Sequence, residues 1–301
     1  DRMFTLESCR PVGTRRICAV AVLLFVLVTM PVRGQHPPPV FDPPIRFYLA
    51  LGDSIAYGFQ EFKFEANLPP PAYNTGYVDV FAARLRQIRP ELAVVNYSCP
   101  GESTDSFVNG GCIWTETGHP LHDAYLGTQL QAALAFLRHH PGQVSPITLT
   151  LFGNDMPLLL NPCTAVNGQI DLNCVQAAAP GFIAGLTERI SNILRQLRSA
   201  APNAEIIVMG GWDEFLDALA FADPLYQGFN AALADAAADN RARFANPFPI
   251  FNPQGNAAKE VQTICTLTLL CIQNDVHPSD AGYRALADLV FDVSDYARLG
   301  R

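Results

Sequence analysis

The stretch YLALGDSIAYGFQ, residues 48–60, carries the first decision about the fold. Its apolar run ends in Gly52, Asp53 and Ser54, and the residues from Ser54 onward are typical of the start of a helix. The junction between a buried strand and a helix has no structural need for a hydroxyl. Because ligands of parallel α/β sheets bind beyond the carboxyl ends of the strands, Ser54 is a candidate functional residue.

Strand-like and helix-like stretches alternate along the rest of the chain. Apolar runs typical of strands occupy residues 46–53, 92–99, 147–155 and 204–211, and a shorter one occupies 247–251. Apolar residues at helical spacing occupy residues 76–88, 124–140, 181–200, 224–243 and 281–293. This alternation predicts an α/β fold, a three-layer sandwich with a central, mostly parallel sheet flanked by helices.

The first 45 residues differ from the rest in composition. Residues 15–35 combine two arginines, an apolar run, a proline and then small residues, which predicts a secretory signal peptide over residues 1–34. The alternative is an uncleaved membrane anchor, but the apolar run is shorter than the roughly 20 residues that span a bilayer. Residues 35–45 indicate a proline-rich linker. We therefore expect a secreted domain at 46–301, without stable membrane insertion once the leader is cleaved.

The charge of the chain limits its partners. It has 20 basic and 28 acidic residues, a net charge of −8. Residues 1–34 hold five arginines and two acidic residues, so the remainder carries 15 basic and 26 acidic residues, a net charge of −11. An acidic protein without a basic run is a poor candidate for binding nucleic acid or anionic membranes. We expect a monomer that acts on a small-molecule or lipid substrate.

Cysteines indicate an oxidising compartment. Cys9 and Cys18 belong to the leader, and the other six fall into three local pairs, Cys99 with Cys112, Cys163 with Cys174, and Cys265 with Cys271. An even number of cysteines behind a signal peptide predicts disulfides, although many other connectivities are open. No cysteine or histidine cluster has zinc spacing. His119 and His122 are interpreted as part of a polar loop rather than as metal ligands.

Four polar clusters follow predicted strands or precede the last helix. They are Gly52-Asp53-Ser54, residues 98–103, Gly153-Asn154-Asp155 and residues 274–278. In this order they resemble the GDSL or SGNH hydrolase family, with Ser54 in LGDS, Gly101, Asn154 in GND and His277 in DVHPSDAGY. The resemblance spans residues 46–295 and implies an SGNH hydrolase-like, flavodoxin-like fold. The loop VNYSCPGESTDSF also looks like those of secreted bacterial lipases and esterases of this family.

The chemistry of such a site can be argued from the residue types. A serine hydroxyl is a weak nucleophile until a base takes its proton, and His277 is the natural base. The imidazole needs a partner at Nδ1. The commonest family pattern has an aspartate three residues before the histidine, where this chain has Asn274. We expect Asp275 to serve through a different local turn; the alternative is a Ser-His dyad oriented by a main-chain carbonyl near Asn274.

Ester hydrolysis also needs hydrogen-bond donors for the developing oxyanion. We expect three to converge, the backbone N–H groups of Ser54 and Gly101 and the side-chain amide of Asn154. Gly101 suits the role because the missing Cβ lets the backbone approach the substrate. Taken alone, Gly101 and Asn154 would each be interpreted as an ordinary turn residue.

These residues predict a secreted carboxylic ester hydrolase, an esterase or lipase, that uses no metal or organic cofactor. The alternatives are a carbohydrate acetylesterase on the same scaffold and a secreted binding module without turnover. Apolar residues in two loops favour lipid-like or aryl esters, unless they simply pack the domain: Met156, Leu158, Leu159, Leu160, Phe62 and Phe64.

The cysteine pairs lie close in sequence to the proposed site. Cys99 precedes Gly101, Cys163 follows Asn154 and Cys271 precedes His277. We hypothesise that each disulfide braces one loop of the site.

Overall fold

A computed structural model describes residues 41–216, 218–294, 296 and 299. The signal peptide predicted at 1–34 and residues 35–40 of the predicted linker lie outside the described residues. The strands are β1 (Phe47–Gly52), β2 (Ala93–Asn96), β3 (Val144–Thr150), β4 (Ile206–Met209), β5 (Arg243–Ala245), β6 (Thr268–Leu269) and β7 (Asp275–Pro278). The longer helices are α3 (Tyr77–Ile88), α6 (Gln129–His139), α8 (Leu172–Ala200), α9 (Leu219–Asp239), α11 (Ala257–Leu267) and α13 (Asp280–Val293). Shorter helices are α1 (Ser54–Tyr57), α2 (Glu61–Glu65), η1 (Pro70–Tyr73), α4 (Thr104–Asn109), α5 (Ile113–Glu116), η2 (Gly153–Asp155), α7 (Met156–Leu160), η3 (Asn161–Cys163), α10 (Phe248–Phe251) and α12 (Leu270–Gln273).

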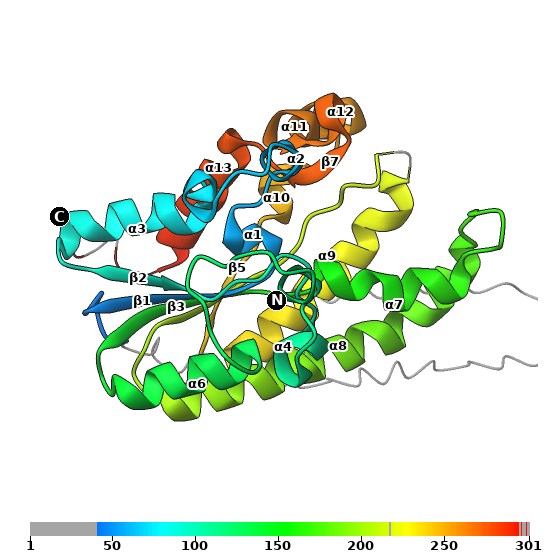
Figure 1. The fold of residues 1–301 in the computed structure, drawn as a ribbon. Coiled ribbons are helices and arrows are strands. Elements are labelled where there is room, and N and C mark those ends of the chain that lie inside the picture. Colours follow the sequence, from blue (N-terminus) through cyan, green and yellow to red (C-terminus); the bar gives the residue numbers. More distant parts are fainter. Residues whose placement is uncertain (1–40, 217, 295, 297–298, 300–301) are drawn as a thin grey trace, which may run out of the picture. The chain divides into compact units, whose positions relative to one another are not determined.

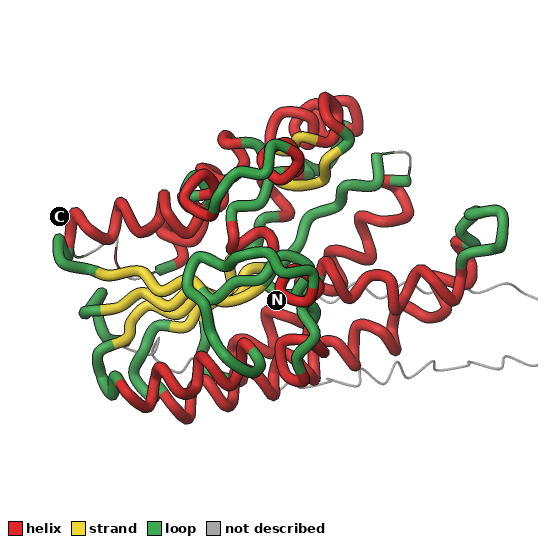
Figure 2. The backbone as a smooth tube through the Cα atoms, viewed as in Figure 1, coloured by secondary structure: helices red, strands yellow, loops and turns green. Residues whose placement is uncertain are grey.

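The central sheet has five strands in the order β2-β1-β3-β4-β5, and every pair is parallel. Helices cover both of its faces (Figures 1 and 2). This is the flavodoxin-like strand order, in which the chain turns back beside β1 and leaves the carboxyl ends of β1 and β3 adjacent. The predicted three-layer α/β fold is confirmed. A separate two-stranded antiparallel ribbon joins β6 to β7.

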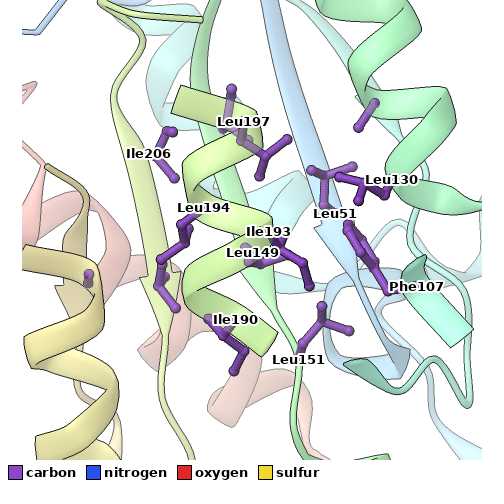
Figure 3. Packing of buried hydrophobic residues seen from close by; sticks show 14 of the residues in the cluster. Leu51, Phe107, Leu130, Leu149, Leu151, Ile190, Ile193, Leu194, Leu197 and Ile206 are labelled. Carbon is purple, nitrogen blue, oxygen red and sulfur yellow. The ribbon is translucent and has the colours of Figure 1, made fainter. Parts of the chain in front are cut away.

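One face of the sheet packs against α4, α6, α8 and α9. Leu149 of β3 and Leu151, which directly follows this strand, pack against the face of α8 that carries Ile193 and Leu194 (Figure 3). These side chains are fully or almost fully buried. The long helix α8 therefore holds β3, and with it the polar turn that follows this strand, against the middle of the sheet.

The other face packs against α3 and α13. Tyr77 and Phe81 of α3 and Tyr283 of α13 are completely buried there. The hydroxyl of Tyr283 donates to the carbonyl of Phe59 at 2.7 Å, so α13 is tied to the loop that follows α1. This contact positions the segment just before α13, which contains His277, relative to the segment just after Ser54.

Three elements differ from the sequence prediction. Helix α8 begins at Leu172 rather than 181 and continues through Pro180, because Val175 and Ala179 pack with Leu159 in a satellite core. Strand β5 lies where the helix predicted at 224–243 was expected to end. The apolar run 247–251 forms the short helix α10 instead of a strand. Within the described part of the chain, no helix combines the length and the apolar character needed to cross a bilayer.

Candidate active site

Ser54 and His277 meet although 223 residues separate them in sequence. Ser54 is the first residue of α1, directly beyond the carboxyl end of β1, and His277 lies in β7. The Oγ of Ser54 is 2.9 Å from Nε2 of His277. The tight turn into α1 requires glycine at position 52, where φ is +130° and a Cβ would lie 2.0 Å from the carbonyl oxygen of Thr150.

Asp275 lies on the other side of the imidazole. Its Oδ1 is 2.5 Å from Nδ1 of His277 and also accepts the backbone N–H of His277 at 3.0 Å. Asn274 ends α12 in the left-handed conformation with φ of 55°, a conformation that asparagine tolerates better than most residues. This single left-handed residue turns the chain so that an aspartate two residues before the histidine reaches Nδ1.

The carboxylate of Asp275 has a partner for each oxygen. Oδ2 accepts the backbone N–H of Glu61 at 2.8 Å, at the start of α2. Burial acts to raise the pKa of Asp275, but the hydrogen bond and charge of His277, with the backbone N–H groups of Glu61 and His277, lower it below its ordinary value overall. An ionised carboxylate only accepts, so Nδ1 is the donor and Nε2 remains free to accept the hydroxyl proton of Ser54.

Gly101 and Asn154 come from the loops after β2 and β3. Gly101 has φ of +87°, and a Cβ there would lie 2.4 Å from Cγ2 of Ile113. The side-chain amide of Asn154 donates to the carbonyl of Glu102 at 2.9 Å, and its second N–H remains available. Among the described residues, the backbone N–H groups of Ser54 and Gly101 have no hydrogen-bond acceptor. Unpaired donors of this kind are what an oxyanion site requires.

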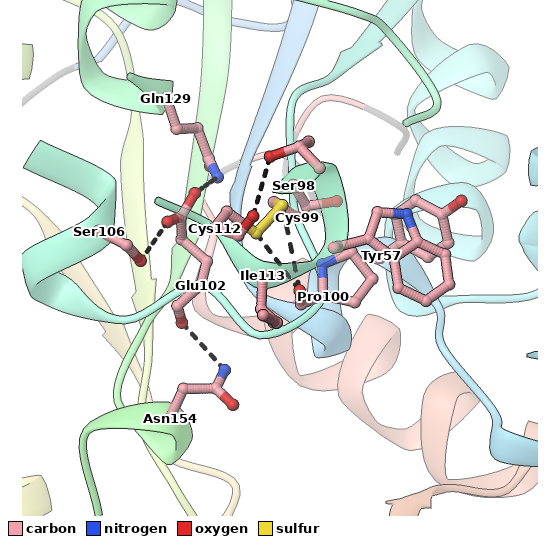
Figure 4. The surroundings of a disulfide bond; sticks show 12 residues. Tyr57, Ser98, Cys99, Pro100, Glu102, Ser106, Cys112, Ile113, Gln129 and Asn154 are labelled. Carbon is pink, nitrogen blue, oxygen red and sulfur yellow. Dashed lines mark hydrogen bonds between the residues drawn. A yellow bond between two sulfur atoms is a disulfide. The ribbon is translucent and has the colours of Figure 1, made fainter. Parts of the chain in front are cut away.

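A buried polar network links these loops, and the sequence analysis did not anticipate it. The carboxamide of Gln129 accepts the N–H of Gly52 at 2.6 Å and donates to the carbonyl of Gly52 at 3.0 Å. It also donates to Oε2 of Glu102 at 2.7 Å, while the hydroxyl of Ser106 donates to Oε1 (Figure 4). Burial raises the pKa of Glu102 to about 7, against the opposing effect of its hydrogen bonds. The network fixes the Ser54 turn relative to the Gly101 loop.

The turn that carries Asn154 has a second attachment through its neighbour. Asp155 is completely buried and accepts the N–H of Thr104 at 2.9 Å and its hydroxyl at 2.6 Å. Arg189 of α8 lies 3.5 Å from the same carboxylate. Two consecutive residues of η2 therefore contact residues 102 and 104, so hydrogen bonds join the loops after β2 and β3.

The aspartate of the first polar cluster has a structural partner. Asp53 is buried and caps α1 by accepting the backbone N–H of Ile55 at 3.0 Å. Burial raises the pKa of Asp53 to about 7. Its contacts hold the strand-to-helix turn and do not reach His277.

The structure forms three disulfides, Cys99–Cys112, Cys163–Cys174 and Cys265–Cys271. The first encloses Gly101, the second joins η3 to α8 after the Asn154 turn, and the third joins α11 to α12 just before Asp275. Cys99 and Cys112 are buried, whereas Cys271 is exposed. Each bond therefore lies in or beside a segment that carries one residue of the candidate site.

The apolar residues singled out in the sequence divide into three environments. Met156, Leu159 and Leu160 line an apolar cavity beside α7. Leu158 is 61% exposed. Phe62 is also exposed, and Phe64 packs at the far side of an aromatic cluster in which Phe59 contacts both Phe64 and the ring of His277.

His119 and His122 belong to the same aromatic cluster. The ring of His119 lies 4.5 Å from that of Trp114, and Nε2 of His122 lies 2.9 Å from the carbonyl oxygen of Tyr57. Over the described ranges, three potential metal ligands gather at one place, Cys99, Glu102 and Cys112. Two of these are the sulfurs of a disulfide, which are poor metal ligands because the thiolate is the ligand form of cysteine.

Residues 50–285 match the GDSL-like lipase/acylhydrolase family, and no curated protein matches the sequence. The fold is similar to that of an extracellular lipase from Streptomyces rimosus, with a TM-score of 0.56 at 17% identity over 83% of this chain and 100% of that one. A phospholipase A1 from Streptomyces albidoflavus NA297 aligns with a TM-score of 0.53 at 15% identity, over 83% of this chain and 100% of that one.

A third solved structure, the lipase Lip_vut3 from a goat rumen metagenome, has a TM-score of 0.56 at 18% identity. This alignment covers 84% of the present chain and 99% of the lipase. Identities this low show a common fold only. The family match, by contrast, extends from the end of β1 into α13 and includes all four polar clusters. The chain is a member of the GDSL-like lipase/acylhydrolase family.

Proposed function

We propose that this protein is a secreted esterase or lipase that cleaves carboxylic esters through an acyl-enzyme on Ser54. One observation carries the proposal: a hydroxyl, an imidazole and a carboxylate form a continuous line, with 2.9 Å between Ser54 and His277 and 2.5 Å between His277 and Asp275. Within the described chain Nδ1 of His277 has Asp275 as its partner and no main-chain carbonyl, which favours a triad over a dyad.

The proposed reaction has two halves. His277 takes the proton of Ser54 at Nε2 while Oγ attacks the ester carbonyl carbon, and the carbonyl oxygen becomes an oxyanion. The N–H groups of Ser54 and Gly101 and the amide of Asn154 stabilise that charge. His277 then gives its proton to the leaving alcohol. Water repeats the sequence on the acyl-enzyme, losing a proton to His277, and releases the acid and the free serine.

A fluorophosphonate probe tests the proposed nucleophile. We expect the wild-type protein to be labelled and Ser54→Ala to be unlabelled and inactive toward p-nitrophenyl esters. His277→Ala should label at least 1000-fold more slowly because the hydroxyl has lost its base. Ser199→Ala changes an exposed serine of α8 and serves as the matched control. Labelling that persists in Ser54→Ala would overturn the nucleophile assignment.

Secretion is part of the same proposal. Three disulfides support an oxidising destination, because such bonds rarely persist in the cytosol. Expression of the full chain in a bacterial host should yield a mature protein that begins near Gln35 outside the cytoplasm. Recovery of the uncleaved chain in the membrane fraction would instead support the anchor alternative.

A further inference from the structure

An apolar cavity lies between α7, α8 and α9. Its volume is about 110 Å³ and its walls are apolar throughout. The walls include Phe152, Met156, Leu160, Val175 and Ala222. The single tyrosine of the wall, Tyr226, donates its hydroxyl to Glu214 at 3.0 Å, which satisfies that polar group through a partner of its own.

The cavity begins beside the candidate active site. Phe152 and Met156 line it, and each is two residues from Asn154 in sequence. Two residues of chain span at most about 7 Å, so the cavity wall begins within that distance of the backbone of Asn154. The ring of Phe152 lies 4.5 Å from that of Phe229 in α9, and both rings line the cavity.

The cavity also communicates with solvent. Two of its lining residues, Ile170 and Leu172, are 37% and 45% exposed. In Figure 1, α7 and the first turns of α8 extend past the carboxyl ends of the strands. The Cys163–Cys174 disulfide joins η3, which directly follows α7, to the first turn of α8. Exposed apolar side chains beside an apolar cavity are a signature of a binding site for an apolar group.

We propose that this cavity binds the acyl chain of the ester substrate, and that it selects chains of medium length. The proposal rests on the ester hydrolysis proposed above. A chain bonded to the carbonyl at Ser54 passes Asn154 and enters between Phe152 and Met156. A dry cavity of about 150 Å³ holds benzene, so one of about 110 Å³ holds roughly four carbons, and the carbons that cross from Ser54 bring the acyl group to about six to ten.

Two substitutions of opposite effect test the cavity. Ala222→Leu adds volume to a buried wall residue, and Leu160→Ala removes it from a half-buried one. The measurement is kcat/KM for p-nitrophenyl esters from acetate to palmitate, normalised by titration of Ser54 with the fluorophosphonate probe. Ala220→Leu and Leu158→Ala are the matched controls, since each changes the same residue type at an exposed position outside the cavity.

We expect wild-type kcat/KM to peak at about eight carbons. Ala222→Leu should lower the ratio of octanoate to acetate about tenfold, because one methylene in an apolar pocket changes discrimination by about that factor. Leu160→Ala should move the peak to longer chains by about two carbons. The controls should keep the wild-type profile.

The cavity inference is overturned if neither variant changes the chain-length profile by more than twofold, or if the exposed controls change it equally. Hydrolysis of acetate with an unmoved profile would remove the cavity inference and leave the ester hydrolase standing. A wild-type protein that is not labelled and hydrolyses no ester would instead remove the proposed function. Thermal melting of each variant separates a change in the cavity from a loss of fold.

Discussion

The polar groups on the two sides of Ser54 differ in whether they have hydrogen-bond partners. Toward His277 both carboxylate oxygens of Asp275 are paired: they accept from Nδ1, from the N–H of His277 and from the N–H of Glu61. Toward Gly101 and Asn154, the described structure leaves donors unpaired at the surface of a tightly bonded network. The first side suits a group that must hold one tautomer, and the second suits an anion that exists only during reaction. Paired groups on one side of Ser54 and unpaired donors on the other thus suit different chemical tasks.

The largest effect is expected when the hydrogen bond between Asp275 and His277 is removed. Asp275→Ala removes the acceptor that fixes the Nδ1 proton, so we expect kcat to fall by about 1000-fold or more. Asn274→Gly keeps the left-handed turn and leaves kcat within about twofold, since glycine adopts positive φ freely. Steady-state kinetics on a p-nitrophenyl ester would measure both. Near-wild-type turnover in Asp275→Ala would favour a dyad and contradict the paired arrangement.

A smaller effect is expected on the unpaired side. Asn154→Ala removes a donor that we propose acts only in the transition state, so kcat should fall by about 100-fold while KM changes little. Asn161→Ala alters an exposed asparagine in η3 and is the matched control. If KM rises and kcat is kept, Asn154 contributes to binding and not to the oxyanion site.

The network beneath the unpaired donors gives a pH-dependent effect on stability. Burial raises the pKa of Glu102 to about 7, from a usual value near 4.5. Between these values the unfolded chain loses the proton and the folded protein keeps it, so this group's contribution to the free energy of unfolding decreases as pH rises from about 4.5 to about 7. Glu102→Gln abolishes this titration. The difference in free energy of unfolding between the variant and the wild type should therefore shift in favour of the variant by about 3 kcal/mol as pH rises from about 4.5 to about 7.

Urea unfolding at several pH values measures this difference. Glu116→Gln, an exposed substitution of the same type in α5, should leave the pH dependence as it is in the wild type. Parallel stability curves for Glu102→Gln and the wild type would contradict the raised pKa of Glu102. An activity loss in the same variant would show that the network also positions Gly101.

The smallest effect is expected for the Cys265–Cys271 disulfide, which lies just before Asp275 in the sequence. Replacing Cys265 and Cys271 by serine should cost about 2 kcal/mol of stability, since the closed loop is short. Mild reduction should attack this bond first because Cys271 is exposed, and activity should fall before the helical circular dichroism signal does. Simultaneous loss of activity and helical signal would count against local bracing.

The two sides of Ser54 could not be predicted equally well from the sequence. Ser54 and His277 stand in motifs at predicted strand and loop ends, and the spacing of Asp275 required only a local turn. The left-handed Asn274 that makes this turn is a backbone conformation, which asparagine permits but does not demand. Gln129 gave one faint signal, a polar residue on the same helix face as the buried Leu130, Ala133 and Leu137. Which backbone it would contact depends on the packing of α6 beside β1.

The helical region was harder to predict. Pro180 and Gly181 favour a helix start near 181, because an interior proline costs a hydrogen bond. Tertiary packing of Val175 and Ala179 and the disulfide to Cys163 extend α8 back to Leu172. Leu172, Val175 and Ala179 of this extension line the apolar cavity. It could not be read from the local pattern, which gives the spacing of apolar residues but not the gap left between three helices.

The carboxamide of Gln129 imitates a peptide group. It offers one acceptor and one donor to the same glycine, as a neighbouring strand would, and so it finishes the ladder of β1 with a side chain. Gly52, which turns the chain toward Ser54, is therefore hydrogen-bonded to a helix that begins 77 residues later in the sequence. A shift of that helix along its axis would move Gly52, so the position of Ser54 depends on an element that is distant in sequence.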